Sequence, residues 1–164
     1  LPAHILSGDR PGPVAAVAQA LGIPGTGGLD PAEKLAAITA LAEQGRRVLM
    51  VGDGLNDGPA LAAGHVSVAP ASAADASQNA ADAVFLGASL APVAFAIRAA
   101  RATQAIVRQN FALAIGYNII AVPLAIAGLV TPLIAALAMS GSSIIVVANA
   151  LRLKRLGRLK GLAR

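Results

Sequence analysis

The sequence contains no cysteine and no tryptophan, and only four of its 164 residues are aromatic, three Phe and one Tyr. Without cysteine, the chain itself can hold no disulfide framework, no thiolate zinc site and no cysteine nucleophile. With so few aromatic side chains there is little on which nucleic-acid bases could stack, and we expect no nucleic acid as a partner.

Acidic residues are missing from the second half of the chain. All eight lie between Asp9 and Asp82 together with four basic residues, whereas nine basic residues and no acidic one follow Asp82. The net charge of +5 is therefore −4 up to that point and +9 after it. Such a division is not typical of one soluble globule, and it favours two parts in different surroundings.

The run from Gln109 to Leu151 has no side chain that is charged at neutral pH. It is long enough for two membrane crossings of about 20 residues each. Thr131-Pro132 divides it, and we expect spans over residues 111–130 and 133–150. Eight of the nine basic residues after Asp82 lie close to the two spans on either side: Arg98, Arg101, Arg108, Arg152, Lys154, Arg155, Arg158 and Lys160.

These basic flanks and the uncharged turn predict an orientation. By the positive-inside rule, we expect both flanks in the cytoplasm and the turn on the other side of the membrane. We expect this membrane to be the plasma (inner) membrane. A helical hairpin buried in a large soluble core is the alternative, and the length of two adjacent uncharged runs disfavours it.

Five side chains within the spans are unusual for contact with lipid: Tyr117, Asn118, Met139, Ser142 and Ser143. Polar groups at that depth commonly face other helices or a pathway, and an unsatisfied amide in hydrocarbon costs several kcal/mol. A thioether in a thiol-free chain suits Cu(I) better than Zn(II). Helix packing explains the serines equally well, and a lone methionine in a span is more commonly a packing residue, so both interpretations stay open.

Residues 1–89 alternate short apolar runs with helical patterns. We expect strands at 4–6, 47–51, 65–68 and 83–86, helices near 13–21, 31–44, 58–63 and 73–79, and a loop at 25–28. A final amphipathic helix over 90–110 should run without a break into the first span. Alternating strands and helices predict an α/β fold with a parallel sheet, which binds ligands at the carboxyl ends of its strands.

Two short motifs follow these elements where an anion could bind. Ser7-Gly8-Asp9 comes after the first strand and offers a hydroxyl and backbone amides, although the same tripeptide is a common turn. Lys34 lies in the first turn of a helix that starts at Pro31, and a helix N-terminus already favours phosphate. A single lysine on a helix is more often solvated.

A third motif, Gly52-Asp53-Gly54-Leu55-Asn56-Asp57, follows the strand at 47–51. Two carboxylates four residues apart in a glycine-rich turn are a natural Mg²⁺ site, because Mg²⁺ takes one or two carboxylates together with waters and phosphate oxygens. Mg²⁺ and a lysine would together neutralise the charge on a transferring phosphoryl group.

The soluble motifs resemble those of the P-type ATPases, which belong to the haloacid-dehalogenase-like superfamily. Residues 50–61, Met-Val-Gly-Asp-Gly-Leu-Asn-Asp-Gly-Pro-Ala-Leu, are similar to the family's hinge motif. Ser7-Gly8-Asp9 resembles its second motif, and Pro31 with Lys34 its third. The motifs occur in the family's order, and the resemblance extends over essentially the whole chain.

The spans resemble the last two membrane helices of the heavy-metal (type IB) subgroup. Tyr117-Asn118 is similar to the Tyr-Asn pair of its copper(I) members, and residues 139–143, Met-Ser-Gly-Ser-Ser, are similar to their Met-x-x-Ser-Ser signature. Residues 149–153, Asn-Ala-Leu-Arg-Leu, also fit this subgroup. Among its members, the copper exporters that supply cytochrome oxidase assembly are the most similar.

The resemblance implies a domain plan and a role for each site residue. Residues 1–89 would form the C-terminal part of a Rossmann-like phosphorylation domain, 90–110 a connecting helix, 111–151 the last two membrane helices and 152–164 a basic cytoplasmic tail. In the phosphate site, the turn of Ser7, Gly8 and Asp9 would bind phosphoryl oxygens, Lys34 would neutralise them, and Asn56 would lie near them. Asp53 and Asp57 would hold Mg²⁺. The transported Cu⁺ would pass Tyr117, Asn118, Met139 and Ser142 or Ser143.

The resemblance also implies partners that lie outside these 164 residues. The phosphorylated Asp of an Asp-Lys-Thr-Gly-Thr segment, the domain that mainly binds ATP, the actuator domain and the earlier membrane helices are not in this sequence. The chain starts at Leu1 rather than Met, as a piece of a longer pump would, and we expect it to be inactive alone. Lipid, the remainder of the pump and a copper chaperone are the expected partners.

Three other interpretations remain open. A membrane-tethered dehalogenase-like phosphatase would require an Asp-x-Asp strand, which none of the acidic residues forms. A non-catalytic fragment or subunit that assembles with the rest of a pump is the second. A pump for zinc, cadmium or cobalt is the third, but those relatives carry a Lys and an Asp in these two spans, and this chain has neither there.

Overall fold

The computed structural model describes residues 1–53, 55–87 and 89–154, and the chain divides into two compact units. The first, Leu1–Val93, is called the α/β unit below. The second begins at Ala94 and is called the hairpin. Most of the predicted basic tail, from residue 155 onward, lies outside the described residues.

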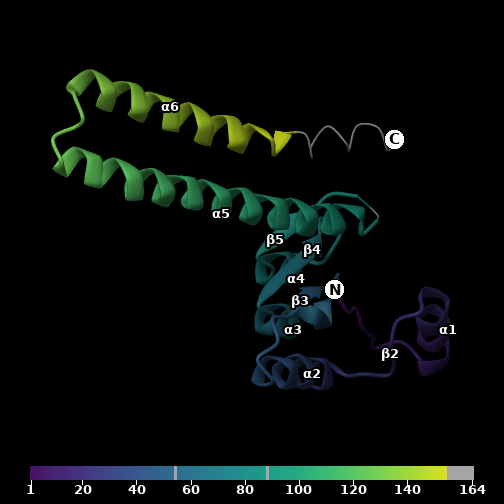
Figure 1. Ribbon diagram of the computed structural model, residues 1–164. Helices are drawn as coiled ribbons and strands as arrows, with labels where there is room; N and C mark the ends of the chain where they lie inside the picture. The colour runs from purple at the N-terminus through teal and green to yellow at the C-terminus, as the bar shows by residue number, and fades with distance from the viewer. Residues whose placement is uncertain (54, 88, 155–164) are drawn as a thin grey trace. The chain divides into compact units, whose positions relative to one another are not determined.

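The α/β unit alternates strands and helices along its length, as the sequence predicts (Figure 1). Its elements are β1 (Ile5–Leu6), α1 (Pro11–Leu21), β2 (Gly25–Thr26), α2 (Pro31–Glu43), β3 (Leu49–Val51), the 3-10 turn η1 (Leu55–Asp57), α3 (Gly58–Ala63), β4 (Val66–Pro70), α4 (Asp75–Ala80) and β5 (Ala83–Phe85).

The first sheet consists of β1 and β2, which are parallel and pair Ile5 with Gly25. The prediction of a loop at residues 25–28 is therefore wrong for Gly25 and Thr26. A side chain at Gly25 would bring a Cβ within 2.7 Å of the Ala18 Cβ, so glycine is what lets α1 lie against this strand. Val14 and Ala18 of α1 are buried in that contact.

The second sheet has the order β3-β4-β5, and both pairings are parallel. Parallel pairing is the predicted arrangement, but within the described residues no strand pairing joins this sheet to β1 and β2. Asp82 fixes the start of β5, because its carboxylate accepts hydrogen bonds from the backbone amide (2.8 Å) and hydroxyl (3.0 Å) of Ser67 in β4. This acidic residue is thus structural.

The hairpin consists of α5 (Ala91–Ile126), which starts three residues before the unit boundary, and α6 (Pro132–Leu151); the two helices run side by side (Figure 1). Both are long and apolar enough to cross a membrane. The prediction that the helix after residue 90 continues unbroken into the first span is confirmed. That span ends at Ile126, four residues early, because Gly128 adopts a φ of 73° and Leu129 N–H closes the helix on the carbonyl of Leu124.

Candidate functional site

The loop after β1 holds Ser7 in a turn that is hydrogen-bonded to the segment between β2 and α2. The Ser7 hydroxyl accepts a hydrogen bond from the Asp9 amide at 3.1 Å. Leu29 N–H donates to the Ser7 carbonyl at 3.0 Å, and Gly28 N–H donates to that of Asp9. A Cβ at Gly27 would lie 2.9 Å from the Asp9 carbonyl oxygen, so the two segments approach this closely because residue 27 is glycine.

Helix α2 begins directly after the segment 27–30 with a complete capping box. Asp30 accepts a hydrogen bond from the Glu33 amide at 2.7 Å, and Glu33 accepts one from the Asp30 amide at 2.9 Å. Pro31 fills the first helical position, where a missing N–H costs nothing. The next residue after this fixed turn is Lys34, so its place is set by local contacts that the sequence encodes.

Lys34 and Asp57 are the predicted site residues that the structure brings into contact. The Lys34 Nζ donates to the Asp57 Oδ1 at 2.7 Å, and both side chains are about nine-tenths buried. The pair joins α2 to the turn η1. Because 23 residues separate the partners, spacing in the sequence gave no signal of it, and the expectation that a single lysine is solvated is wrong here.

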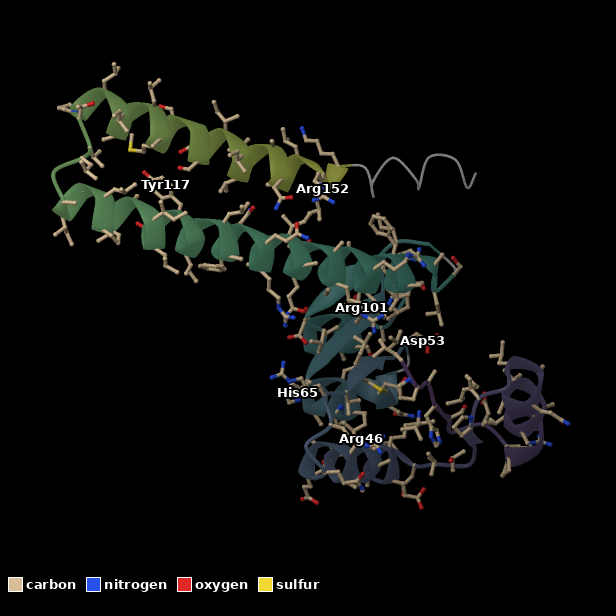
Figure 2. All side chains as sticks on the ribbon, in the orientation of Figure 1. Arg46, Asp53, His65, Arg101, Tyr117 and Arg152 are labelled. Atoms are coloured by element: carbon tan, nitrogen blue, oxygen red, sulfur yellow. The ribbon has the colours of Figure 1, made fainter. Side chains whose placement is uncertain are left out.

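Asp53 and Asn56 are exposed in the segment that follows β3, while Gly52 and Asp57 beside them are buried; Figure 2 labels Asp53. An added Cβ at Gly52 would lie 3.1 Å from the Asp57 Oδ2, so glycine gives that carboxylate room beside the chain. One accessible carboxylate near a second, buried one fits Mg²⁺, which keeps several water ligands and uses few protein oxygens. No group of three or more acidic or imidazole residues that could enclose a metal occurs among the described residues.

The five predicted metal-path residues of the hairpin differ in their exposure. Tyr117 and Ser142 are half-buried, and Figure 2 shows Tyr117 directed from α5 toward α6. Asn118, Met139 and Ser143 are exposed, Met139 by 66%. The hydroxyls of Ser142 and Ser143 both donate to the carbonyl of Met139, and the amide of Asn118 donates to the carbonyl of Ala114 at 2.8 Å. The hairpin by itself does not gather these five residues into one site.

Comparison with known proteins places both units in one family. The family model for haloacid dehalogenase-like hydrolases matches residues 1–65. The nitrogen fixation protein FixI of Bradyrhizobium diazoefficiens is 61% identical over 150 residues, which is 91% of this chain and 20% of that protein. A copper-exporting P-type ATPase of Mycobacterium tuberculosis is 44% identical over 155 residues, 94% of this chain and 20% of the relative.

Solved structures show the same relationship. The crystal structure of a zinc-transporting PIB-type ATPase in the E2P state is similar with a TM-score of 0.82 and 39% sequence identity, over 93% of this chain and 25% of that one. The chain spans about a fifth of the length of its curated relatives. With a dehalogenase-like α/β unit followed by two apolar helices, the chain belongs to the heavy-metal P-type ATPases and corresponds to part of such a pump.

Proposed function

We propose that this chain is the part of an ATP-driven copper(I) pump that contributes a Mg²⁺ and phosphate site and the last two membrane helices. The observation that carries the proposal is the joint presence of two features: the buried Lys34–Asp57 pair with an exposed Asp53 four residues before Asp57, and a hairpin whose uncharged run, residues 109–151, carries Met139. A soluble phosphatase would not need the uncharged helices, and a simple channel would not need the buried Lys34–Asp57 pair.

In the α/β unit, each site residue has a separate role in binding a phosphoryl group. Asp53, exposed after β3, offers its carboxylate to Mg²⁺, and Asp57 orients Lys34 through their 2.7 Å hydrogen bond. Lys34 supplies a fixed positive charge in a partly dehydrated position, where it acts more strongly than in water. The Ser7-Gly8-Asp9 turn binds phosphoryl oxygens and Asn56 lies nearby. When bound, Mg²⁺ supplies further neutralisation of phosphate charge.

In the hairpin, ligand chemistry favours copper. Cu(I) prefers soft sulfur and tolerates low coordination, whereas Zn²⁺ prefers imidazole, thiolate and carboxylate ligands. The hairpin offers the thioether of Met139, the phenol of Tyr117, an amide and two hydroxyls, and no acidic residue occurs after Asp82. The M. tuberculosis relative is a copper exporter, while the similar solved structure transports zinc, so the transported metal is the first thing to test.

The remaining parts of the proposal concern the membrane around the hairpin and the partners of this chain. We place the hairpin in a plasma (inner) membrane with both basic flanks in the cytoplasm, on the distribution of arginine and lysine. The rest of the pump supplies the phosphorylated Asp and the other helices. The separation of β1-β2 from β3-β4-β5 supports this, because a further strand could complete one sheet from the two. A copper chaperone would deliver the cargo.

The test uses the complete pump that contains this chain, purified and reconstituted in lipid vesicles. Cu(I) should stimulate its ATPase activity, and Zn²⁺ should not. Met139→Leu removes the sulfur and keeps the volume, and we expect it to lower copper stimulation by about tenfold or more, because loss of a residue that only supports a metal ligand already costs about 10- to 100-fold. Met50→Leu makes the same change in β3 of the α/β unit and is the matched control, expected to keep full stimulation.

Three results would contradict the proposal. Stimulation by Zn²⁺ in place of Cu(I) would refute the metal while leaving the pump intact. Unchanged stimulation in Met139→Leu would remove this residue from the path. No metal-stimulated ATP hydrolysis by the complete protein would favour a non-catalytic role.

A further inference from the structure

Where α6 ends, four polar side chains connect the two helices of the hairpin. The Asn149 amide donates to the Asn110 side-chain oxygen at 2.9 Å. Arg152 Nη1 lies 3.0 Å from the Asn149 oxygen and 3.4 Å from the Gln109 oxygen, and it donates to both. Figure 2 shows Arg152 on the side of α6 that faces α5. These residues, called the polar clamp, lie at the end of the helix pair opposite the loop at 127–131.

The clamp lies on the same face as two residues of the proposed metal path. Tyr117 follows Asn110 by seven residues, and Ser142 precedes Asn149 by seven. Seven residues are two helical turns, about 10 Å along the axis, so each pair shares a face of its helix. Because α5 and α6 run in opposite directions, equal steps from the clamp bring Tyr117 and Ser142 to the same level of the hairpin.

Burial supports this shared face. In a hairpin whose side chains are mostly exposed, Asn110, Tyr117, Ser142 and Asn149 are all half-buried, whereas the neighbouring Met139 is exposed. Eleven residues from the clamp on each helix, Ala121 and Ala138 are half-buried as well. These residues therefore mark one line along which α5 and α6 face each other, called the seam.

We propose that the polar clamp sets the register of α5 against α6 and thereby positions Tyr117 opposite Ser142. Apolar side chains slide past one another at little cost, since lipid is as apolar as they are, whereas a hydrogen-bonded asparagine pair has one satisfied register. Asn149 is the centre of the clamp because it both donates to Asn110 and accepts from Arg152. Asn110 and Asn149 are positioning residues: they act on the metal through the seam.

The functional test is a double-mutant cycle in the complete pump, and it rests on the proposed copper transport. Asn110→Ala and Asn149→Ala should each raise the Cu(I) concentration for half-maximal ATPase stimulation by about three- to tenfold, the range for one hydrogen bond between membrane helices, with little change in the maximal rate. The double variant should be no worse than either single one. Gln104→Ala, an exposed position on α5, is the control and should behave as wild type. Additive effects, or a lower maximal rate with unchanged half-saturation, would overturn the proposal.

A structural test reads the register without any metal, so it separates failure of this inference from failure of the proposed function. Ala121→Cys with Ala138→Cys, both on the seam, should be joined by a short bifunctional maleimide in the complete pump, as identified by mass spectrometry. Ala121→Cys with Leu137→Cys, whose second position is exposed and off the seam, should not. Adding Asn149→Ala should lower the cross-linking yield of the Ala121–Ala138 pair and raise that of the Ala121–Leu137 pair. An unchanged pattern would show that the clamp does not set the register, whether or not the pump transports copper.

Discussion

The two units hold their predicted functional residues in different ways. In the α/β unit, Lys34 and Asp57 are buried and hydrogen-bonded to each other across 23 residues of sequence. In the hairpin, Met139 is 66% exposed, and the hydroxyls of Ser142 and Ser143 donate to the backbone of their own helix. The proposed phosphate site is thus ordered by contacts within this chain, whereas the proposed metal path would require further helices from other parts of a pump.

The largest effect on folding should come from breaking the buried ion pair. Lys34→Ala leaves the Asp57 carboxylate buried without its cation, and we expect the α/β unit to lose about 3–5 kcal/mol. Hydrogen exchange of the α2 and α3 amides in the complete protein would measure the loss. Lys34→Met with Asp57→Leu removes both charges and should cost much less. A single variant as stable as wild type would show that the pair does not order the site.

A smaller loss should follow from filling the close approach at Gly27. Gly27→Ala places a Cβ 2.9 Å from the Asp9 carbonyl oxygen and from the Pro11 Cα, and such overpacking typically costs about 1–3 kcal/mol. Gly12→Ala, in α1, meets nothing within 4 Å and should be neutral or stabilising by up to about 1 kcal/mol. Urea unfolding of the two variants would compare them. Equal stability would mean that the Ser7 turn is not held by this contact.

The capping box should contribute less again. Asp30→Ala removes the side-chain acceptor for the Glu33 amide, a change that costs about 1 kcal/mol at a helix N-terminus. The protection of amides in the first turn of α2 should fall accordingly. Asp75→Ala is the control because Asp75 lies in the first turn of α4, whose N-cap makes no side-chain hydrogen bond. The same loss of protection in both helices would point to a general charge effect instead.

The smallest effect on folding is expected in the hairpin, where Met139 and Ser143, two of the proposed metal residues, are exposed. Met139→Leu and Ser143→Ala should each change thermal stability by no more than about 0.5 kcal/mol, even though Met139→Leu is expected to lower copper stimulation. Thermal unfolding of the complete protein in detergent, without metal, would measure this. A clear destabilisation would show that these side chains pack within the protein's own fold, and the contrast between the units would disappear.

The sequence predicted those features that depend on neighbouring residues. Helix α3 begins and ends where its pattern placed it, at Gly58 and Ala63, and α5 continues unbroken into the membrane span. Features that depend on distant contacts were missed. Strand β2 is two residues of Gly-Thr with no apolar pattern and exists only through pairing with β1. The Lys34–Asp57 and Ser67–Asp82 contacts likewise join segments that are distant in the sequence, 23 and 15 residues apart.

The central claim is that the segment after β3 holds the Mg²⁺ of phosphoryl transfer. It is tested most directly by measuring phosphoenzyme formation from ATP in the complete pump carrying Asp53→Ala. Asp53 is exposed, so the variant should fold as wild type does by circular dichroism and thermal unfolding. Its phosphoenzyme yield should nevertheless fall by about 100-fold or more, because an interaction with transferring charge is lost. Asp75→Ala, an exposed carboxylate on α4, should keep a normal yield. A normal yield in Asp53→Ala would contradict the account, because the segment after β3 would then not be the Mg²⁺ site of phosphoryl transfer.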